Sequence, residues 1–129
     1  MGGVTLTVTI PGTPPRELSP NARIHWRARA RHTAAYRETA YLATLAAGRV
    51  AFDGDRPVDI RLTYAWARGR KRMDDDNAWA LFKSGRDGVA SALVIDDKVF
   101  RCGSVEQLRD PAGVGYTTIA LWQEEVAGE

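Results

Sequence analysis

Three consecutive aspartates, Asp74, Asp75 and Asp76, are the residues of this 129-residue chain whose types and spacing best suit metal chemistry. Adjacent carboxylates repel one another, and a bound cation or full solvation offsets that repulsion. In an extended segment Asp74 and Asp76 point to the same side, which makes them the better pair of ligands. Oxygen-only ligands select Mg²⁺, with Mn²⁺ as a substitute, rather than zinc. The alternative is helix capping, but a cap at Asp76 or Asn77 requires one polar residue and not three acids.

Lys83 and Asp87 follow Asp76 at intervals of seven and eleven residues, which are close to whole turns of a helix. In a continuous helix the three residues share one stripe, with Lys83 about 10 Å and Asp87 about 16 Å from Asp76 along the axis. Asp87 is therefore too distant to share an ion with Asp76. We expect Lys83 to contact a neighbouring phosphate or to be solvated. Asp87 either pairs with Lys83 at i,i+4 or has a functional role.

The pair Asp96-Asp97 precedes an apolar segment and has two interpretations. Aspartates are common in turns, so the pair is explained by a turn alone. A strand that pairs beside residues 58–66 could instead return Asp97, or Asp96 in its place, to the neighbourhood of Asp74 and Asp76. A three-carboxylate cluster of that kind binds Mg²⁺, which polarises a scissile phosphate and activates a water molecule.

The charge of the chain is segregated although its formal net charge is only +2. Two stretches, 16–37 and 61–72, each carry +5, so the remaining positions together carry −8. Basic stretches of this density attract polyanions, of which nucleic acid is the commonest. The alternative is a solvated surface that is balanced by acids elsewhere.

The basic residues are mainly arginines, 15 of them against three lysines, and the planar guanidinium fits phosphate through two hydrogen bonds. The candidates for contact with a phosphodiester backbone lie in the two basic stretches: Arg23, Arg27, Arg29, Arg70, Lys71 and Arg72.

The elements that must position these residues follow from hydrophobic periodicity. Strict alternation predicts strands over 4–10 and 58–66, and helical spacing of apolar residues predicts helices over 32–47 and 77–93. Two further strands are expected over 99–108 and 115–123, joined by a turn at 110–113. The order β-α-β-α-β-β predicts one α+β domain over 1–129, a small two-layer domain with a mixed β-sheet and two helices packed on one face.

Other classes of protein are excluded by composition. The single cysteine, Cys102, permits neither an internal disulfide framework nor a thiolate zinc site, and we expect it to pack as a small apolar residue. The N-terminus does not resemble a signal peptide, and no apolar run has membrane-spanning length, so a cytoplasmic location is expected. Trp26 is expected to pack in a loop, and the other three tryptophans to lie in the core or a dimer interface.

The string Arg72-Met73-Asp74-Asp75-Asp76-Asn77, followed by Lys83, Asp87 and Asp96-Asp97, resembles the RusA family of Holliday-junction resolvases, of the phage and prophage type. That family has a D-x-D-N element, a following helix with Lys and Asp four apart, and an Asp-Asp pair before the next strand. The segment from Ser19 to Trp26, between a proline-rich loop and a helix, is similar as well. The resemblance extends in order over nearly the whole chain. Asn77 and Lys83 are further apart here than in the best-known member, although other phage-type members resemble the longer spacing.

The resemblance implies a crossover junction endodeoxyribonuclease, a phosphodiester hydrolase of DNA recombination and repair. By this resemblance Asp74, Asp76 and Asp97 are the catalytic metal-binding acids and Lys83 assists them. It also implies a homodimer that nicks four-way DNA junctions symmetrically with Mg²⁺ in a bacterial or phage-infected cell. Two alternatives stay open: a DNA-binding protein without cleavage activity, and a Mg²⁺-dependent nuclease for other branched DNA such as flaps or forks.

Overall fold

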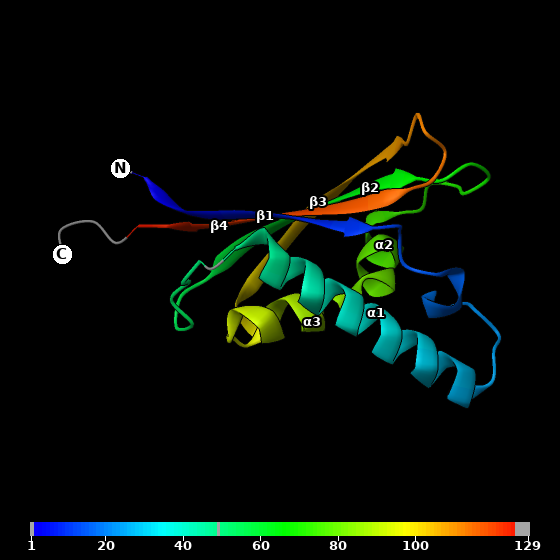
Figure 1. The fold of residues 1–129 in the computed structure, drawn as a ribbon, viewed down its shortest axis with the longest axis horizontal. Coiled ribbons are helices and arrows are strands. Elements are labelled where there is room, and N and C mark those ends of the chain that lie inside the picture. The colour runs from blue at the N-terminus through cyan, green and yellow to red at the C-terminus, as the bar shows by residue number, and fades with distance from the viewer. Residues whose placement is uncertain (1, 49, 126–129) are drawn as a thin grey trace.

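The computed structural model describes residues 2–48 and 50–125, and it shows the α+β architecture that the periodicity predicts (Figure 1). Four strands form one mixed sheet, and the helices lie against one of its faces. In chain order the elements are β1 (Gly3–Pro11), the short 3-10 helix η1 (Arg16–Leu18), α1 (Trp26–Ala47), β2 (Val58–Trp66), α2 (Asp75–Leu81), α3 (Lys83–Leu93), the 3-10 helix η2 (Asp97–Val99), β3 (Phe100–Arg109) and β4 (Tyr116–Glu124).

The sheet has the strand order β1-β4-β2-β3. Strand β4 pairs antiparallel with both β1 and β2, whereas β3 pairs parallel with β2. In the parallel pair Val58 lies opposite Phe100 and Trp66 lies opposite Arg109. Because β2 and β3 run in the same direction, the residues that follow β2 and the residues that precede β3 lie at opposite ends of the sheet. The parallel pairing therefore places Asp74–Asp76, which follow β2, and Asp96-Asp97, which precede β3, at opposite ends of the sheet.

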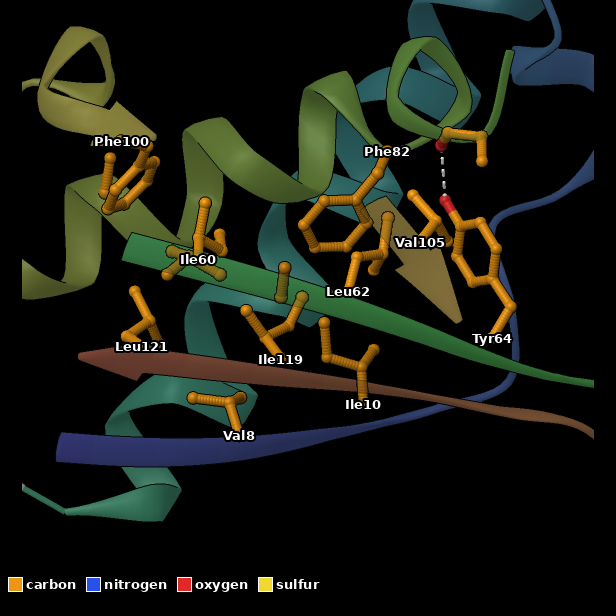
Figure 2. Close-up of a cluster of buried hydrophobic side chains, with 14 of the residues drawn as sticks. Val8, Ile10, Ile60, Leu62, Tyr64, Phe82, Phe100, Val105, Ile119 and Leu121 are labelled. Carbon is orange, nitrogen blue, oxygen red and sulfur yellow. Dashed lines mark hydrogen bonds between the residues drawn. The ribbon is translucent and has the colours of Figure 1, made fainter. Parts of the chain in front are cut away.

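The core lies between the sheet and the helices (Figure 2). Alternate residues of β1, β2 and β4 point into it, among them Val8, Leu62 and Ile119, which are fully buried. Tyr64 is also buried, and its hydroxyl donates a 2.8 Å hydrogen bond to the carbonyl oxygen of Ala78 in α2. This bond ties the first helix after β2 to the sheet.

The helix predicted over 77–93 is two helices, α2 and α3, separated at Phe82. Phe82 has φ −90° and ψ 4°, and its fully buried ring makes edge contacts with the rings of Tyr36 and Trp79. The burial of this aromatic ring favours a break that the sequence pattern does not predict. As a result Asp76 belongs to α2 while Lys83 and Asp87 belong to α3, and the three residues do not form the single stripe expected of a continuous helix.

Helix α1 begins at Trp26, six residues before the predicted start at residue 32. His25 caps it, because its Nδ1 accepts a hydrogen bond of 3.1 Å from the backbone N–H of Arg27. The first turns are polar and exposed, so hydrophobic periodicity gives no signal for them. The predicted strands agree with the observed ones within about one residue at each end, within the usual uncertainty of element boundaries.

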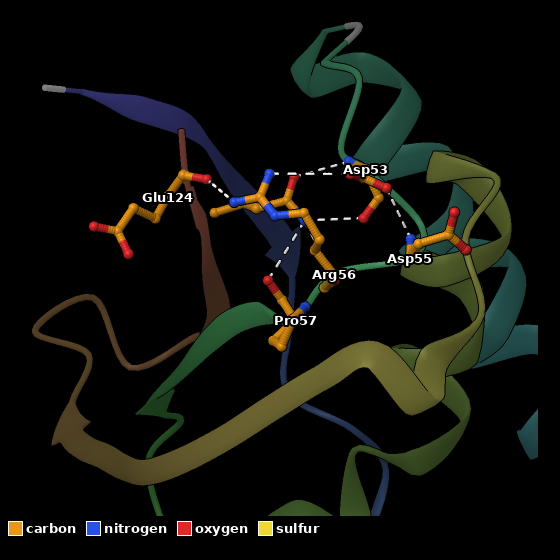
Figure 3. A network of polar contacts seen from close by, with 6 residues as sticks. Asp53, Asp55, Arg56, Pro57 and Glu124 are labelled. Carbon is orange, nitrogen blue, oxygen red and sulfur yellow. Dashed lines mark hydrogen bonds and ion pairs between the residues drawn. The ribbon is translucent and has the colours of Figure 1, made fainter. Parts of the chain in front are cut away.

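The loop before β2 is fixed to the end of β4 by buried Gln123. The side-chain amide of Gln123 accepts from the backbone N–H of Asp53 at 2.8 Å and donates to the Asp53 carbonyl at 2.9 Å. Arg56 adds a hydrogen bond to the carbonyl oxygen of Glu124 and an ion pair with Asp53 (Figure 3). This end of the sheet is therefore closed by a polar clamp that is distant from α2.

Two of the single-residue expectations, those for Cys102 and Trp26, are wrong. Cys102 is exposed on β3, which is an edge strand of the sheet. Trp26 is 68% exposed at the start of α1. Trp122 is 41% exposed on the sheet face away from the helices, so it lies outside the core, and its place in a dimer interface stays a prediction. Trp66 is in the core as expected. No helix within residues 2–48 and 50–125 is both long and apolar enough to cross a membrane.

Candidate functional site

The three consecutive aspartates lie at the start of α2. Asp74 is the N-cap: its Oδ1 accepts a 2.8 Å hydrogen bond from the backbone N–H of Asn77, and Oδ2 lies 3.4 Å from the Asn77 amide nitrogen. Asp75 and Asp76 occupy the first helical turn. All three are exposed. The N-cap of α2 is thus Asp74, and not Asp76 or Asn77 as considered from the sequence. Of the three aspartates, Asp74 alone has the extended backbone expected of the segment, because Asp75 and Asp76 are helical.

The backbone before Asp74 is held by Gln107, a buried residue of β3. Its Oε1 accepts hydrogen bonds of 3.0 Å from the Trp66 indole and from the Met73 backbone N–H. Its Nε2 donates to the Met73 carbonyl oxygen at 2.6 Å. The amide group of Gln107 therefore acts as both donor and acceptor, and it fixes the backbone of Met73 immediately before Asp74.

Asp97 lies beside α3 and not beside Asp74. Its Oδ2 is 3.6 Å from Nε of Arg86. Asp96 caps η2 by accepting a 2.9 Å hydrogen bond from the Lys98 backbone N–H. The turn interpretation of the Asp96-Asp97 pair is thus correct for Asp96.

The separation between the two groups of acids follows from the parallel pairing of β2 and β3. Met73, next to Asp74, bonds Gln107, whereas Arg86, the partner of Asp97, donates to Sγ of Cys102 at 3.6 Å. Gln107 and Cys102 are five residues apart on β3, which is roughly 16 Å of strand. Among residues 2–48 and 50–125, no three Asp, Glu, His or Cys side chains converge in a way that could hold a metal ion. A single chain therefore does not assemble the three-carboxylate cluster expected from the sequence.

Asp87 lies between Lys83 and Asp97. Partial burial raises the pKa of its carboxyl group, the hydrogen bond with Asp97 raises it further, and the ammonium group of Lys83 acts in the opposite direction. The expected i,i+4 relation of Lys83 and Asp87 is present in α3, but no ion pair within 4.0 Å joins the two side chains in the described part of the chain.

Two of the six candidate phosphate contacts are engaged in structural bonds. Arg29 donates to the carbonyl oxygens of Ser19 and Ala22 and thereby holds the loop before α1. Arg70 stacks over the Trp66 ring at 4.9 Å and bonds Thr13 and Pro14. Burial lowers the pKa of Arg70, with a smaller contribution from Arg16. Arg29 and Arg70 therefore stabilise the loops of the basic surface, and their guanidinium groups are already engaged in contacts within the protein.

The other four candidates are exposed. Arg23, Lys71 and Arg72 lie on loops, and Arg27 lies 5.2 Å above the ring of exposed Trp26. Lys71 and Arg72 immediately precede Met73 and the aspartates, so cations and carboxylates are neighbours at the start of α2.

Two arginines that organise the site, Arg109 and Arg86, were not predicted from the sequence. Arg109 donates hydrogen bonds to the carbonyl oxygens of Ala67 and Arg70, which fixes the basic loop between β2 and α2. Arg86 pairs with Asp97. For Arg86, its position next to Asp87 in the sequence was a signal that it belongs among the acids. For Arg109 the sequence holds no such signal, because its hydrogen bonds depend on the register of the sheet.

Comparisons with known proteins give no functional assignment. No family model matches the chain. A protein from Xylella fastidiosa (strain Temecula1 / ATCC 700964), described as an uncharacterized protein, is 40% identical over 98 residues. That match covers 73% of this chain and 61% of the relative, so the chain spans about three fifths of the length of that protein. A solved structure of IspF from Plasmodium falciparum in complex with CDP aligns over 97% of this chain and 98% of its own, with 12% identity and a TM-score of 0.33. A likeness at this level supports no conclusion about function.

Proposed function

We propose that this protein is a Mg²⁺-dependent, structure-selective endonuclease that resolves four-way DNA junctions by paired symmetric nicks, as in recombination and repair. The observation that carries the proposal is the direct succession of exposed cations and exposed carboxylates at the start of α2. Lys71 and Arg72 suit phosphate contact, while Asp74 and Asp76 suit a hard cation.

The donor set at the start of α2 fits Mg²⁺ without a third protein ligand. Magnesium commonly keeps several waters and uses one or two carboxylates together with substrate phosphates. Asp74 and Asp76 would hold the ion, which when bound supplies the polarisation of a phosphodiester and the activation of water. Asn77 donates to both oxygens of Asp74, through its backbone N–H and its side-chain amide, and each carboxylate oxygen has a further lone pair to offer. Asp97 does not take part in this arrangement within one chain.

The chain's own residues bind and orient the DNA. Exposed cations at the start of α1 and in the basic loop contact the backbone and set its register without reading sequence. Gln107 and Arg109 fix the position of the basic loop relative to Asp74, because each forms hydrogen bonds to the backbone between β2 and Asp74. Lys83, at the start of α3, contributes a further positive charge next to α2.

Paired incision requires two such sites. A homodimer with two-fold symmetry would present two copies of the site to a junction that is itself nearly symmetric. The two cuts would then follow from one binding event, which is the basis for proposing a dimer.

The test is cleavage of a synthetic four-way junction in Mg²⁺ and in EDTA. The proposal predicts two symmetric nicks in Mg²⁺ and none in EDTA, with Asp76→Asn inactive and Asp55→Asn, an exposed aspartate on the distant loop, fully active. A junction that is bound but never cut by any divalent cation would favour a DNA-binding protein. Preferential cutting of flaps or forks would favour a nuclease for other branched DNA.

A further inference from the structure

A hollow of about 520 Å³ lies on the face of the sheet that the helices do not cover, and β2, β3 and β4 line it. The register of the sheet explains its shape. Trp122 of β4 lies opposite Asp59 of β2, and Ala120, the next residue of β4 on the same face, lies opposite Arg61. The bulky indole therefore borders a depression whose floor is a methyl group.

Trp122 presents an aromatic ring at the border of this hollow, and 41% of its surface is exposed. Its indole is seated against the neighbouring strand β1, because a Cβ atom on Gly3 would lie 2.9 Å from the indole nitrogen. An aromatic side chain that is held in place by its neighbours and still accessible is suited to stacking with a flat partner.

The hollow carries a net positive charge. Arg101 and Asp59 offset each other, because the guanidinium group donates to both carboxylate oxygens at 2.9 and 3.0 Å. Arg61 lines the same hollow and is exposed, and no acid within residues 2–48 and 50–125 forms an ion pair with it. One arginine charge therefore stays unneutralised beside the ring of Trp122. Arg61 opens the basic stretch 61–72, but it belongs to β2 and not to the basic loop.

We propose that this outer face of the sheet binds a segment of single-stranded DNA, with one base stacked on the Trp122 indole and an adjoining phosphate at Arg61. Proteins that bind single strands combine aromatic side chains, on which bases stack, with cations that follow the phosphate backbone. A single strand fits because its bases have free faces, whereas the bases of a duplex are stacked on one another.

The charge of the hollow favours DNA over a second copy of this chain as its occupant. In a two-fold dimer the same patch of both subunits meets, so a positive hollow would face itself. The inference goes beyond the proposed nuclease, since α2 and the aspartates lie on the helical side of the sheet and strand binding at Trp122 requires no metal.

The experiment measures binding of a fluorescently labelled oligothymidylate of about ten nucleotides by anisotropy, in EDTA so that no cleavage occurs. Trp122→Ala is expected to weaken binding about 5- to 150-fold, the contribution of one base stacked on an aromatic ring. Trp122→Phe keeps an aromatic face and should remain closer to wild type, which separates stacking from damage to the sheet. Tyr41→Ala, which removes an exposed aromatic ring on α1, is the matched control and should bind as wild type does.

The contribution of Arg61 is tested by the salt dependence of the same binding. Arg61→Ala should make the slope of log K against log salt shallower by about 0.7, as the loss of one phosphate contact does for a single strand. Lys98→Ala, which removes an exposed cation beside Asp96, is the control and should leave the slope unchanged.

Wild-type affinity in Trp122→Ala would overturn the inference, as would equal affinity for dTMP and for the oligomer, which would indicate a mononucleotide site. Dimerisation that Trp122→Ala abolishes without an effect on oligomer binding would assign the hollow to a contact between two copies and also overturn it. Strand binding that depends on Trp122, without cleavage of any junction, would support this inference and defeat the nuclease. Junction cleavage without strand binding at Trp122 would do the reverse.

Discussion

Arg86 and Asp97 face each other across 3.6 Å, between α3 and the start of η2, and this pair accounts for the position of the last acid of the sequence pattern. Arg86 is anchored by Cys102 of β3 as well. Asp97 is thereby held at the end of the sheet where β3 begins, whereas Asp74 follows the loop at the end of β2.

Metal binding by single-residue variants separates Asp97 from the other two acids. If Asp74 and Asp76 hold the ion, Asp76→Asn loses Mn²⁺ binding, while Asp97→Asn retains wild-type affinity, because its carboxylate contacts Arg86 and Asp87 instead. Isothermal titration calorimetry with Mn²⁺ measures both. An equal loss of affinity in the two variants would show that Asp97 binds the same ion, as the family resemblance implies.

Gln107 is predicted to support the site without contacting the ion. Gln107→Leu leaves the Met73 backbone groups and the Trp66 indole without partners, at about 1–3 kcal/mol for each group that stays buried. The variant should be less stable to urea and bind Mn²⁺ more weakly. Gln123→Leu, which breaks the clamp at the other end of the sheet, is the matched control. It should lose stability and keep Mn²⁺ affinity; equal affinities in the two variants would refute the positioning role.

The sheet was largely predictable from the sequence, because the strict alternation of apolar and polar residues in β1 and β2 indicates strands with one face buried. The start of α1 was not predictable, since its exposed first turns show no periodic pattern of apolar residues. The break at Phe82 was not predictable either, because it depends on contacts with Tyr36, a residue distant in the sequence. The position of Asp97 was unpredictable for a similar reason. Local spacing does not say whether β3 runs parallel or antiparallel to β2, and the parallel arrangement places Asp97 far from Asp74.

Close packing of α3 on α1 gives a prediction about stability. A Cβ atom on Gly88 would lie 2.3 Å from the carbonyl oxygen of Arg37, a backbone atom that cannot move aside easily. Gly88→Ala should therefore lower the free energy of unfolding by about 1–3 kcal/mol, as overpacking does. Gly103→Ala, where a Cβ meets nothing within 4 Å, is the control. Urea denaturation that shows equal stability for both variants would contradict this packing.

The turn between β3 and β4 has a predicted pH dependence. Asp110 accepts backbone hydrogen bonds from Gly115 at 2.8 Å and Ala112 at 3.0 Å, and these lower the pKa of its carboxyl group from its usual value. A depressed folded-state pKa stabilises the fold above the unfolded value, and that contribution is lost as pH falls through the folded-state pKa. Wild type should thus be more stable than Asp110→Asn at neutral pH, with the difference shrinking as pH falls below the usual carboxyl pKa of about 3.9 and through the lower folded-state pKa. A difference in stability that stays constant as the solution is acidified would exclude this role for the carboxylate.

The most direct test of the central claim is the rate of cleavage of one four-way DNA junction by wild type, Asp76→Asn and Asp55→Asn at saturating Mg²⁺. We expect two symmetric nicks by wild type and Asp55→Asn, and a rate for Asp76→Asn that is lower on the order of 100-fold or more, as when one electrostatic group of an active site is removed. Junction binding should be unimpaired in all three proteins. Cleavage by Asp76→Asn at the wild-type rate, or an intact junction with wild type, would show that Asp76 does not hold a catalytic Mg²⁺ for junction cleavage.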